Sequence, residues 1–360
     1  MAFEKVARFT YFTCHSQETQ HASSWDELAS RFQDISSKSG DIWWLDLCDA
    51  AEEDIAAASR LLSMHPLTVE DIALQEPRQK IETFPGYYLI SLRTLTSSLD
   101  EQPQSTGEAP FLPATSPTML YILVFSQGTV TFSRSGCGHV SRVRSRISRL
   151  HDRSVLSSDW ICYALLDDVI DSFQPHMEMM SSESEAIQDQ IFIARDDDMT
   201  PLMLRIYNIR KRINHLTYSL SGKSDVLNGF VKRCQTQAWH PAFPEGDLIV
   251  YLSDVQDHLV TILAELSHLD EITSRLQSNF LAQTSVNNMR LSVRLNSGLS
   301  KVTVLATIFV PLHMVTGLFG MNVTVPGQDI ESLAWFFGIV GVFVAVILVA
   351  CFAAVRLKLL

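Results

Sequence analysis

The stretch of the sequence best suited to chemistry is Gly320-Met321-Asn322, which ends an apolar run. Asparagine offers an amide oxygen and an amide NH2 and carries no charge. In a symmetric oligomer several such amides would ring an axis and could hold a hydrated cation through its water shell. Mg²⁺ suits such a site because it gives up water reluctantly and prefers oxygen ligands. The alternative is an ordinary helix stop, in which the glycine lets the backbone leave the helix.

A second candidate is a row of residues on one face of the same segment. The side chains that share this face at helical spacing are Asn296, Leu299, Thr303, Val310 and Gly317. Two polar residues among small and aliphatic ones would suit a pore wall whose apolar constrictions gate by dewetting. The alternative is that the threonines bond to helix carbonyls and that the other residues pack against neighbouring helices.

Carboxylates form a third set of candidates. Asp71 closes the stretch His65 to Asp71 and follows Glu70, and Asp254 and Asp257 lie one turn apart in a helical region. Their oxygens could bind divalent cations between subunits. The alternative is that each is a solvated acid on a helix surface.

His313 lies within the apolar run, and ionisable residues in membrane segments are functional candidates by default. A neutral imidazole bonded to a neighbouring backbone group fits the same position equally well.

Two apolar segments near the C-terminus predict a helical hairpin across a membrane. Residues 302–319 would form a helix of roughly 27 Å, near the minimum for a bilayer, and residues 333–355 are long enough to span it. The loop 320–332 contains Asp329 and Glu331 and no lysine or arginine, whereas basic residues flank the outer ends of both segments. We therefore expect both termini to be cytosolic and the loop to lie outside.

Composition excludes several classes of function. The formal net charge of −12 argues against nucleic acid and against docking on anionic lipid, because both need a basic face. It would suit a body that gathers cations, although a solvated acidic surface is the simpler explanation. The six cysteines are scattered without a CxxC pair, which argues against a zinc cluster. The N-terminus has no signal peptide, so we expect the C-terminal hairpin to direct insertion.

No enzyme motif is present. The sequence lacks the P-loop, GxGxxG, HExxH and GxSxG patterns, and no catalytic constellation of side chains stands out. We therefore expect a protein that is not an enzyme and that needs no organic cofactor.

The pattern of elements predicts a cytosolic α/β domain followed by helices. Strand-like segments in 6–14, 41–47, 79–96 and 119–134 mix with helical ones over residues 1–155. A segment rich in Ser, Pro, Thr and Gly, 97–118, reads as a surface insertion. From Leu248 to Pro311 no proline or cluster of breakers interrupts the helical pattern, which predicts a very long helix.

The predicted domains after residue 155 follow in one sequence. They are a cytosolic helical region (156–246), a stalk helix (247–301), a pore-lining first span (302–319), an outer loop (320–332), a second span (333–355) and a cytosolic tail (356–360).

Taken together, these stretches resemble the CorA family of magnesium transporters. The resemblance rests on HPLTVEDI (65–72), QKIE (79–82), ALLDDVID (164–171), YLSDVQDH (251–258) and the segment 301–323 with its Gly-Met-Asn ending. Residues 325–328 resemble the fungal branch of the family. The chain departs from the family at Ser285, Val286 and Asn287, where an acidic residue would be expected.

The resemblance implies a homopentameric funnel in a lipid bilayer, with the long helix running into the pore and the second span forming an outer ring. Gly320, Met321 and Asn322 would form the selectivity filter, and Asn296, Leu299, Thr303 and Val310 would match pore-lining positions. Asp71 and Asp254 match acids that bind regulatory Mg²⁺ between subunits. Filling them would hold the channel shut, and emptying them would leave carboxylates that repel each other.

Three hypotheses follow. The first is a Mg²⁺ channel driven by the membrane potential, in a plasma membrane or a vacuolar-type membrane. The second is a transporter of Zn²⁺, Co²⁺ or Ni²⁺ on the same fold, which His313 would favour as a softer ligand. The third is a membrane-anchored sensor or assembly protein without a pore.

Overall fold

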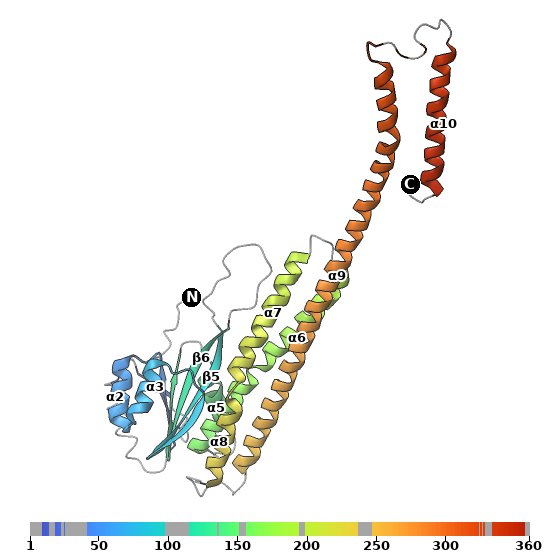
Figure 1. Cartoon of the computed structure of the whole chain (residues 1–360). Coiled ribbons are helices and arrows are strands. Elements are labelled where there is room, and N and C mark those ends of the chain that lie inside the picture. Colours follow the sequence, from blue (N-terminus) through green and yellow to red (C-terminus); the bar gives the residue numbers. More distant parts are fainter. Residues whose placement is uncertain are drawn as a thin grey trace. The chain divides into compact units, whose positions relative to one another are not determined.

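The computed structural model describes residues 9–13, 19–22, 25, 42–97, 115–134, 137–150, 156–193, 199–236, 247–323, 325, 327 and 333–356 (Figure 1). The chain divides into two compact units. The first comprises residues 1–189 and 204–276, and the second comprises residues 190–203 and 277–360.

A seven-stranded sheet forms the centre of the first unit. Its strands are β1 (Phe9–Thr13), β2 (Thr19–Ala22), β3 (Trp43–Cys48), β4 (Lys80–Phe84), β5 (Tyr87–Ser97), β6 (Thr115–Phe125) and β7 (Gly128–Ser133). They lie in the order β2-β1-β3-β7-β6-β5-β4. All neighbouring pairs are antiparallel except β3 and β7, which run parallel with Trp43 opposite Gly128. This mixed sheet confirms the predicted α/β class of the domain.

Helices cover both faces of the sheet. Because successive side chains of a strand point to opposite sides, the central strands bury side chains on both faces. On one face, Leu45 and Leu47 of β3 and Leu89 of β5 share a core with the helices α2 (Glu52–Leu62) and α3 (Pro66–Leu74). The opposite face packs against α5 (Ser158–Asp171) and α8 (Lys223–Thr236), as Figure 1 shows. The sheet is therefore an internal layer between helices.

The strand β4 was not predicted as a separate element. The predicted strand within residues 79–96 corresponds to β5, and β4 pairs with it through a tight turn at Pro85 and Gly86. Gly86 has a φ of 96°, a conformation that glycine adopts without steric cost. The predicted insertion between residues 97 and 118 is shorter than expected, since β5 and β6 extend into it. Its centre, 98–114, lies outside the described residues.

The remaining helices of the first unit follow the sheet in the sequence. They are α4 (His139–Ser148), α5, most of α6 (Gln174–Ile193), most of α7 (Met199–Leu220), α8 and the beginning of α9. The sequence had predicted helix for this region, and the structure confirms it.

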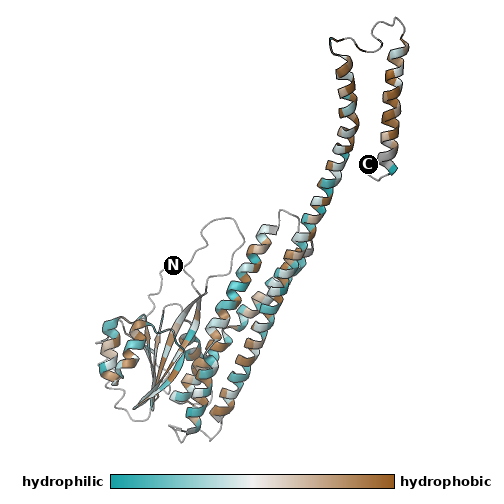
Figure 2. Ribbon diagram, viewed as in Figure 1, coloured by the Kyte–Doolittle hydropathy of each residue, from teal (hydrophilic) through white to brown (hydrophobic). Residues whose placement is uncertain are grey.

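The second unit contains most of the C-terminal helices. The helix α9 (Asp247–Phe319) runs for 73 residues without a break, including Pro311, and α10 (Ala334–Arg356) has 23 residues. Apolar residues gather in the C-terminal part of α9 and along α10 (Figure 2). Among the described residues, α9 is the one helix long and apolar enough to cross a membrane, and Ala334–Ala350 forms a shorter apolar helix.

Candidate functional site

The predicted pore face lies along the exposed side of α9. Asn296, Leu299, Thr303, Val310 and Gly317 are all exposed in the single chain, with Leu299 65% and Val310 64% accessible. In a soluble segment such exposure of leucine and valine would be unfavourable, so a further surface or lipid is expected to cover the helix.

A groove between α9 and α10 shows which residues of α9 face α10 rather than the predicted pore. On α9 it is lined by Pro311, Leu312, Val315 and Phe319, and on α10 by residues from Ala334 to Val346. At 100° per residue these four positions point about 150° away from the mean direction of the predicted pore residues. The helix α10 therefore covers one side of α9 and leaves the predicted pore face uncovered.

The threonines of this segment bond to the backbone of their own helix. Thr303 Oγ1 donates to the carbonyl of Leu299 (2.9 Å), and Thr307 Oγ1 donates to the carbonyl of Thr303 (2.8 Å). This arrangement is the alternative that the sequence left open. It does not remove Thr303 as a polar contact, because a hydroxyl that has donated its proton still presents acceptor lone pairs.

The tripeptide Gly320-Met321-Asn322 follows the last turn of α9 directly. The N–H of Gly320 donates to the carbonyl of Thr316 (3.0 Å), and the N–H of Met321 donates to that of Leu318 (3.4 Å). The helix therefore ends at this tripeptide, as in the helix-stop alternative that the sequence offered, and the φ of Gly320 is not positive. A Cβ at this position would lie 3.4 Å from the Thr316 oxygen, an ordinary contact. Nothing within the described part of the chain therefore requires glycine at position 320.

Asp71 is fixed by the short helix α3. His65 caps this helix, with Nδ1 accepting from the N–H of Leu67 (3.2 Å), and Pro66 begins it. The buried Tyr87 hydroxyl accepts from the N–H of His65 (2.9 Å) and shares a hydrogen bond with Thr68 Oγ1 (2.7 Å). These contacts tie α3 to strand β5.

The carboxylate of Asp71 forms an ion pair with Lys80 on β4, with 2.8 Å between Oδ2 and Nζ. Its side chain is only 16% exposed, whereas Glu70 beside it is exposed. The lysine is a residue that sequence reasoning did not single out for a site role.

Asp254 lies in a different setting, near the start of α9. Its side chain is 65% exposed, and its nearest charged contact is His258, with 4.0 Å between Oδ1 and Nε2. Asp257 is exposed as well. Hard carboxylate oxygens with this accessibility fit a divalent cation.

A group of potential metal ligands next to Asp254 was missed at the level of sequence. Asp167 and Asp171 on α5 and His258 on α9 place one ligand atom each within 4.8 Å of one another. Burial and the charge of Asp167 raise the pKa of Asp171, and His258 partly opposes the rise. The three potential ligands are thus different residues from Asp71 and Asp254, which the sequence had suggested as metal ligands. The spacing of four between Asp167 and Asp171, and between Asp254 and His258, was the available signal.

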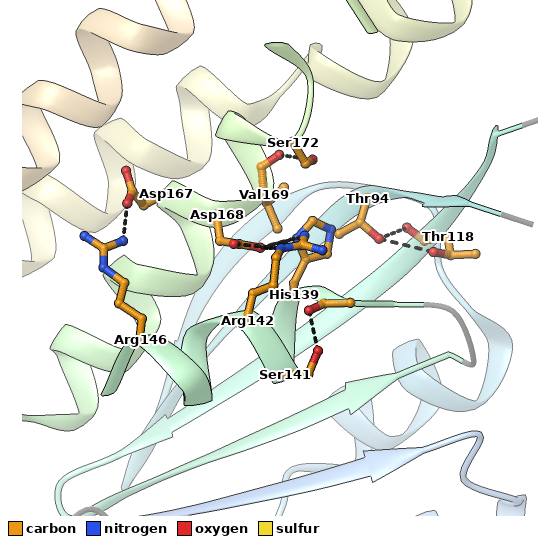
Figure 3. Close-up of polar contacts among 11 residues, drawn as sticks. Thr94, Thr118, His139, Ser141, Arg142, Arg146, Asp167, Asp168, Val169 and Ser172 are labelled. Atoms are coloured by element: carbon orange, nitrogen blue, oxygen red, sulfur yellow. Dashed lines mark hydrogen bonds and ion pairs between the residues drawn. The ribbon is translucent and has the colours of Figure 1, made fainter. Parts of the chain in front are cut away.

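The neighbouring carboxylates of α5 are already used to hold α4 (Figure 3). Arg146 donates to Asp167 (2.6 Å), and Arg142 donates to both oxygens of Asp168. His139 Nδ1 lies 2.7 Å from Asp168 Oδ2. Burial alone would raise the pKa of Asp168, but its bonds to His139 and Arg142 hold that pKa below the usual value. Asp168 is therefore a structural anchor.

The loop acids Asp329 and Glu331 lie outside the described residues. In the part of the loop that is described, Gly327 has a φ of 96° and faces the ring of Trp335 at the start of α10.

Comparison with known proteins adds a family and a fold. The family described as CorA-like Mg²⁺ transporter protein matches residues 39–354. The magnesium transporter ALR1 of Saccharomyces cerevisiae is 35% identical over 98% of this chain and 45% of its own length. A Schizosaccharomyces pombe protein named as a metal ion transporter is 40% identical over 97% of this chain and 42% of its own length. The chain thus spans about half the length of these two relatives.

Among solved structures, the chain resembles the CorA magnesium transporter from Methanocaldococcus jannaschii. The TM-score is 0.62 at 16% identity, covering 88% of this chain and 90% of that one. The cytoplasmic domain of ZntB from Vibrio parahaemolyticus has a TM-score of 0.54 at 7% identity, covering 77% of this chain and 97% of that one. These likenesses concern the fold.

Proposed function

Because the chain belongs to the CorA-like Mg²⁺ transporter family, we propose that it forms a homopentameric channel that carries Mg²⁺ across a membrane into the cytosol. The family consists of transporters rather than enzymes, and the similarity to yeast transporters agrees with the predicted fungal branch. In this proposal residues 302–319, at the end of α9, and residues 333–355, which include nearly all of α10, both span the bilayer, and both termini are cytosolic. The membrane is a plasma membrane or a vacuolar-type membrane.

The observation that supports the proposal is that the groove with α10 is lined on α9 by Pro311, Leu312, Val315 and Phe319, which point away from the predicted pore residues. Asn296, Leu299, Thr303, Val310 and Gly317 are exposed, like most of this part of α9, and have no cover from the described chain. Copies of α9 that meet on the predicted pore face would enclose an axis lined by two polar residues and by small or aliphatic ones. Leu299 and Val310 would then form apolar constrictions that open and close by wetting.

The selectivity filter in this proposal is a ring of Gly320, Met321 and Asn322 at the outer end of the pore. The asparagine amides would hold the ion through its water shell, which suits Mg²⁺. Since no neighbour within the described chain requires glycine at position 320, we infer that close approach of other subunits requires it. Asp329 and Glu331 would raise the local cation concentration in front of the filter.

Regulation would use carboxylates on the cytosolic side. Asp71 of one subunit and Asp254 of the next would bind Mg²⁺ between them, with Glu70 and Asp257 as further oxygen donors. The accessible carboxylate of Asp254 fits this role directly, whereas Asp71 must first part from Lys80. Bound Mg²⁺ would supply positive charge that holds neighbouring acids together, so a high cytosolic concentration would close the channel.

A matched pair of substitutions on α9 tests the pore. Val310→Phe places a ring on the predicted pore face, and Leu305→Phe places one on a different, equally bare side of the helix, where leucine is 58% exposed. We expect Val310→Phe to abolish Mg²⁺ influx into vesicles and Leu305→Phe to leave it within about twofold of wild type. Equal flux in the two variants would refute the assignment of the pore face.

Competition by hexaamminecobalt(III), a mimic of hydrated Mg²⁺, separates the Mg²⁺ channel from a transporter that strips its ion. Inhibition supports selection of the hydrated ion. Uptake of Zn²⁺, Co²⁺ or Ni²⁺ that the mimic does not inhibit would favour the other-divalent alternative. A monomer or dimer without flux would favour the non-conducting sensor.

A further inference from the structure

Lys80 brings a permanent cation to the carboxylate of Asp71. The ammonium lies 2.8 Å from Asp71 Oδ2 and 3.0 Å from Glu82 Oε1. The side chains of Lys80 and Asp71 are 20% and 16% exposed, so water screens their attraction less than at an open surface. In the isolated chain, the ammonium of Lys80 thus compensates the negative charge of the Asp71 carboxylate.

The position of Lys80 is set by the residue before it. The side chain of Gln79 accepts from the N–H of Arg93 (3.1 Å) and from Lys223 Nζ (2.7 Å), and it donates to the carbonyls of Ser219 (3.2 Å) and Ser221. These bonds tie the start of β4 to β5 and to the turn between α7 and α8. Because Lys80 follows this anchor and pairs with Ser91 in the sheet, its side chain starts from a fixed point beside α3.

The ammonium of Lys80 is held between two carboxylates, those of Asp71 and Glu82. A divalent cation that approaches Asp71 therefore meets an ion pair rather than a bare carboxylate.

Asp254 provides the contrast. Its carboxylate is 65% exposed, and the ionisable side chain that contacts it is His258, with 4.0 Å between Oδ1 and Nε2. A cation can reach Asp254 without displacing an ammonium group, so the two halves of the proposed regulatory site differ in what binding must break.

We propose that Lys80 is an internal competitor for the regulatory cation: it neutralises Asp71 when the site is empty and must be displaced when Mg²⁺ binds. Lys80 then sets the Mg²⁺ concentration at which the site fills. It also limits the repulsion between carboxylates in the empty state. The inference rests on the proposed function, because it takes Asp71 as a ligand of regulatory Mg²⁺.

The test is a Mg²⁺ titration of the assembled full chain in detergent, read as protection from limited digestion by chymotrypsin, which does not cut at lysine. For Lys80→Gln we expect the half-protecting Mg²⁺ concentration to fall about fivefold, which corresponds to about 1 kcal/mol. Lys80→Arg, which retains the charge, and Lys211→Gln, which removes an exposed lysine of α7, should leave the half-protecting concentration at the wild-type value.

Glu82→Gln provides a second variant with the opposite sign. This variant removes the second carboxylate that attracts the ammonium of Lys80, so Lys80 pairs with Asp71 alone and is harder to displace. The half-protecting Mg²⁺ concentration should therefore rise about twofold. An unchanged midpoint in both Lys80→Gln and Glu82→Gln would overturn the inference.

Asp71→Asn separates this inference from the proposed function. If Asp71→Asn abolishes protection while Lys80→Gln and Glu82→Gln leave the midpoint unchanged, only the role of Lys80 is refuted. If Asp71→Asn leaves protection unchanged, the proposed regulatory site is refuted together with the inference. In the supported case, Lys80→Gln has no further effect in the Asp71→Asn background.

Discussion

Asp46 is a buried carboxylate in β3 whose ionisation should weaken the sheet domain at neutral pH. Its Oδ1 accepts from Thr131 Oγ1 (2.6 Å) and Ser133 Oγ (3.2 Å). Burial raises its pKa to about 6, although these two hydrogen bonds and Arg144 partly oppose the rise. The folded protein therefore holds a proton on Asp46 between about pH 4 and pH 6, where the unfolded chain has released it. The stabilisation from this proton is complete at low pH and is lost as the pH rises through 6.

Asp46→Asn removes this cost, because an asparagine oxygen can accept the same two hydrogen bonds without charge. A pKa rise of about two units corresponds to about 3 kcal/mol. The variant should gain about 1 kcal/mol in the free energy of unfolding at pH 4.5 and up to about 3 kcal/mol at pH 8.

The assay is denaturant unfolding of the full chain followed by tryptophan fluorescence, since Trp44 donates to Thr131 (3.1 Å) beside the site. Glu52→Gln, on an exposed position of α2, is the matched control and should stay within about 0.5 kcal/mol of wild type. A stability difference for Asp46→Asn that does not grow with pH would refute the reasoning.

Two further substitutions test the contacts that position α8 and α3. Gly229→Ala would place a Cβ against Ile81 Cγ2, so it should destabilise the domain by about 1–3 kcal/mol in the same denaturant assay, and Ile81→Ala should restore part of the loss; no loss would contradict the packing of α8 on β4. Tyr87→Phe leaves the N–H of His65 and the hydroxyl of Thr68 without their partner, which should cost about 1–3 kcal/mol and speed hydrogen exchange in residues 66–74; unchanged exchange there would show that Tyr87 does not hold α3.

Much of the fold could be predicted because its signals are local. The long helix α9 followed from a run without breakers, and its end at Phe319 from the glycine that follows. The hairpin of β6 and β7 was indicated by Gln127 and Gly128 between two apolar stretches; its turn lies at Ser126 and Gln127, and Gly128 begins β7. The short strand β4 was missed because two of its five residues, Lys80 and Glu82, are charged, because its residues are at most partly buried, and because only two residues separate it from β5.

The candidate site was less predictable, because its contacts join distant parts of the chain. The pairing of Asp71 with Lys80 depends on how α3 packs beside β4, and the group of Asp167, Asp171 and His258 depends on the packing of α5 against α9. Residue spacing within one helix cannot reveal either contact.

The most direct test of the central claim is Mg²⁺ flux into proteoliposomes that contain the purified full chain, with a Mg²⁺-sensitive dye inside and a negative internal potential. Asn322→Ala is compared with wild type and with Asn228→Ala, which alters an exposed contact of α8 with Gln256. We expect flux in wild type and Asn228→Ala, and its loss in Asn322→Ala with assembly intact. Normal flux in Asn322→Ala, or no flux from an intact wild-type oligomer at low Mg²⁺ on the cytosolic face, would contradict the account.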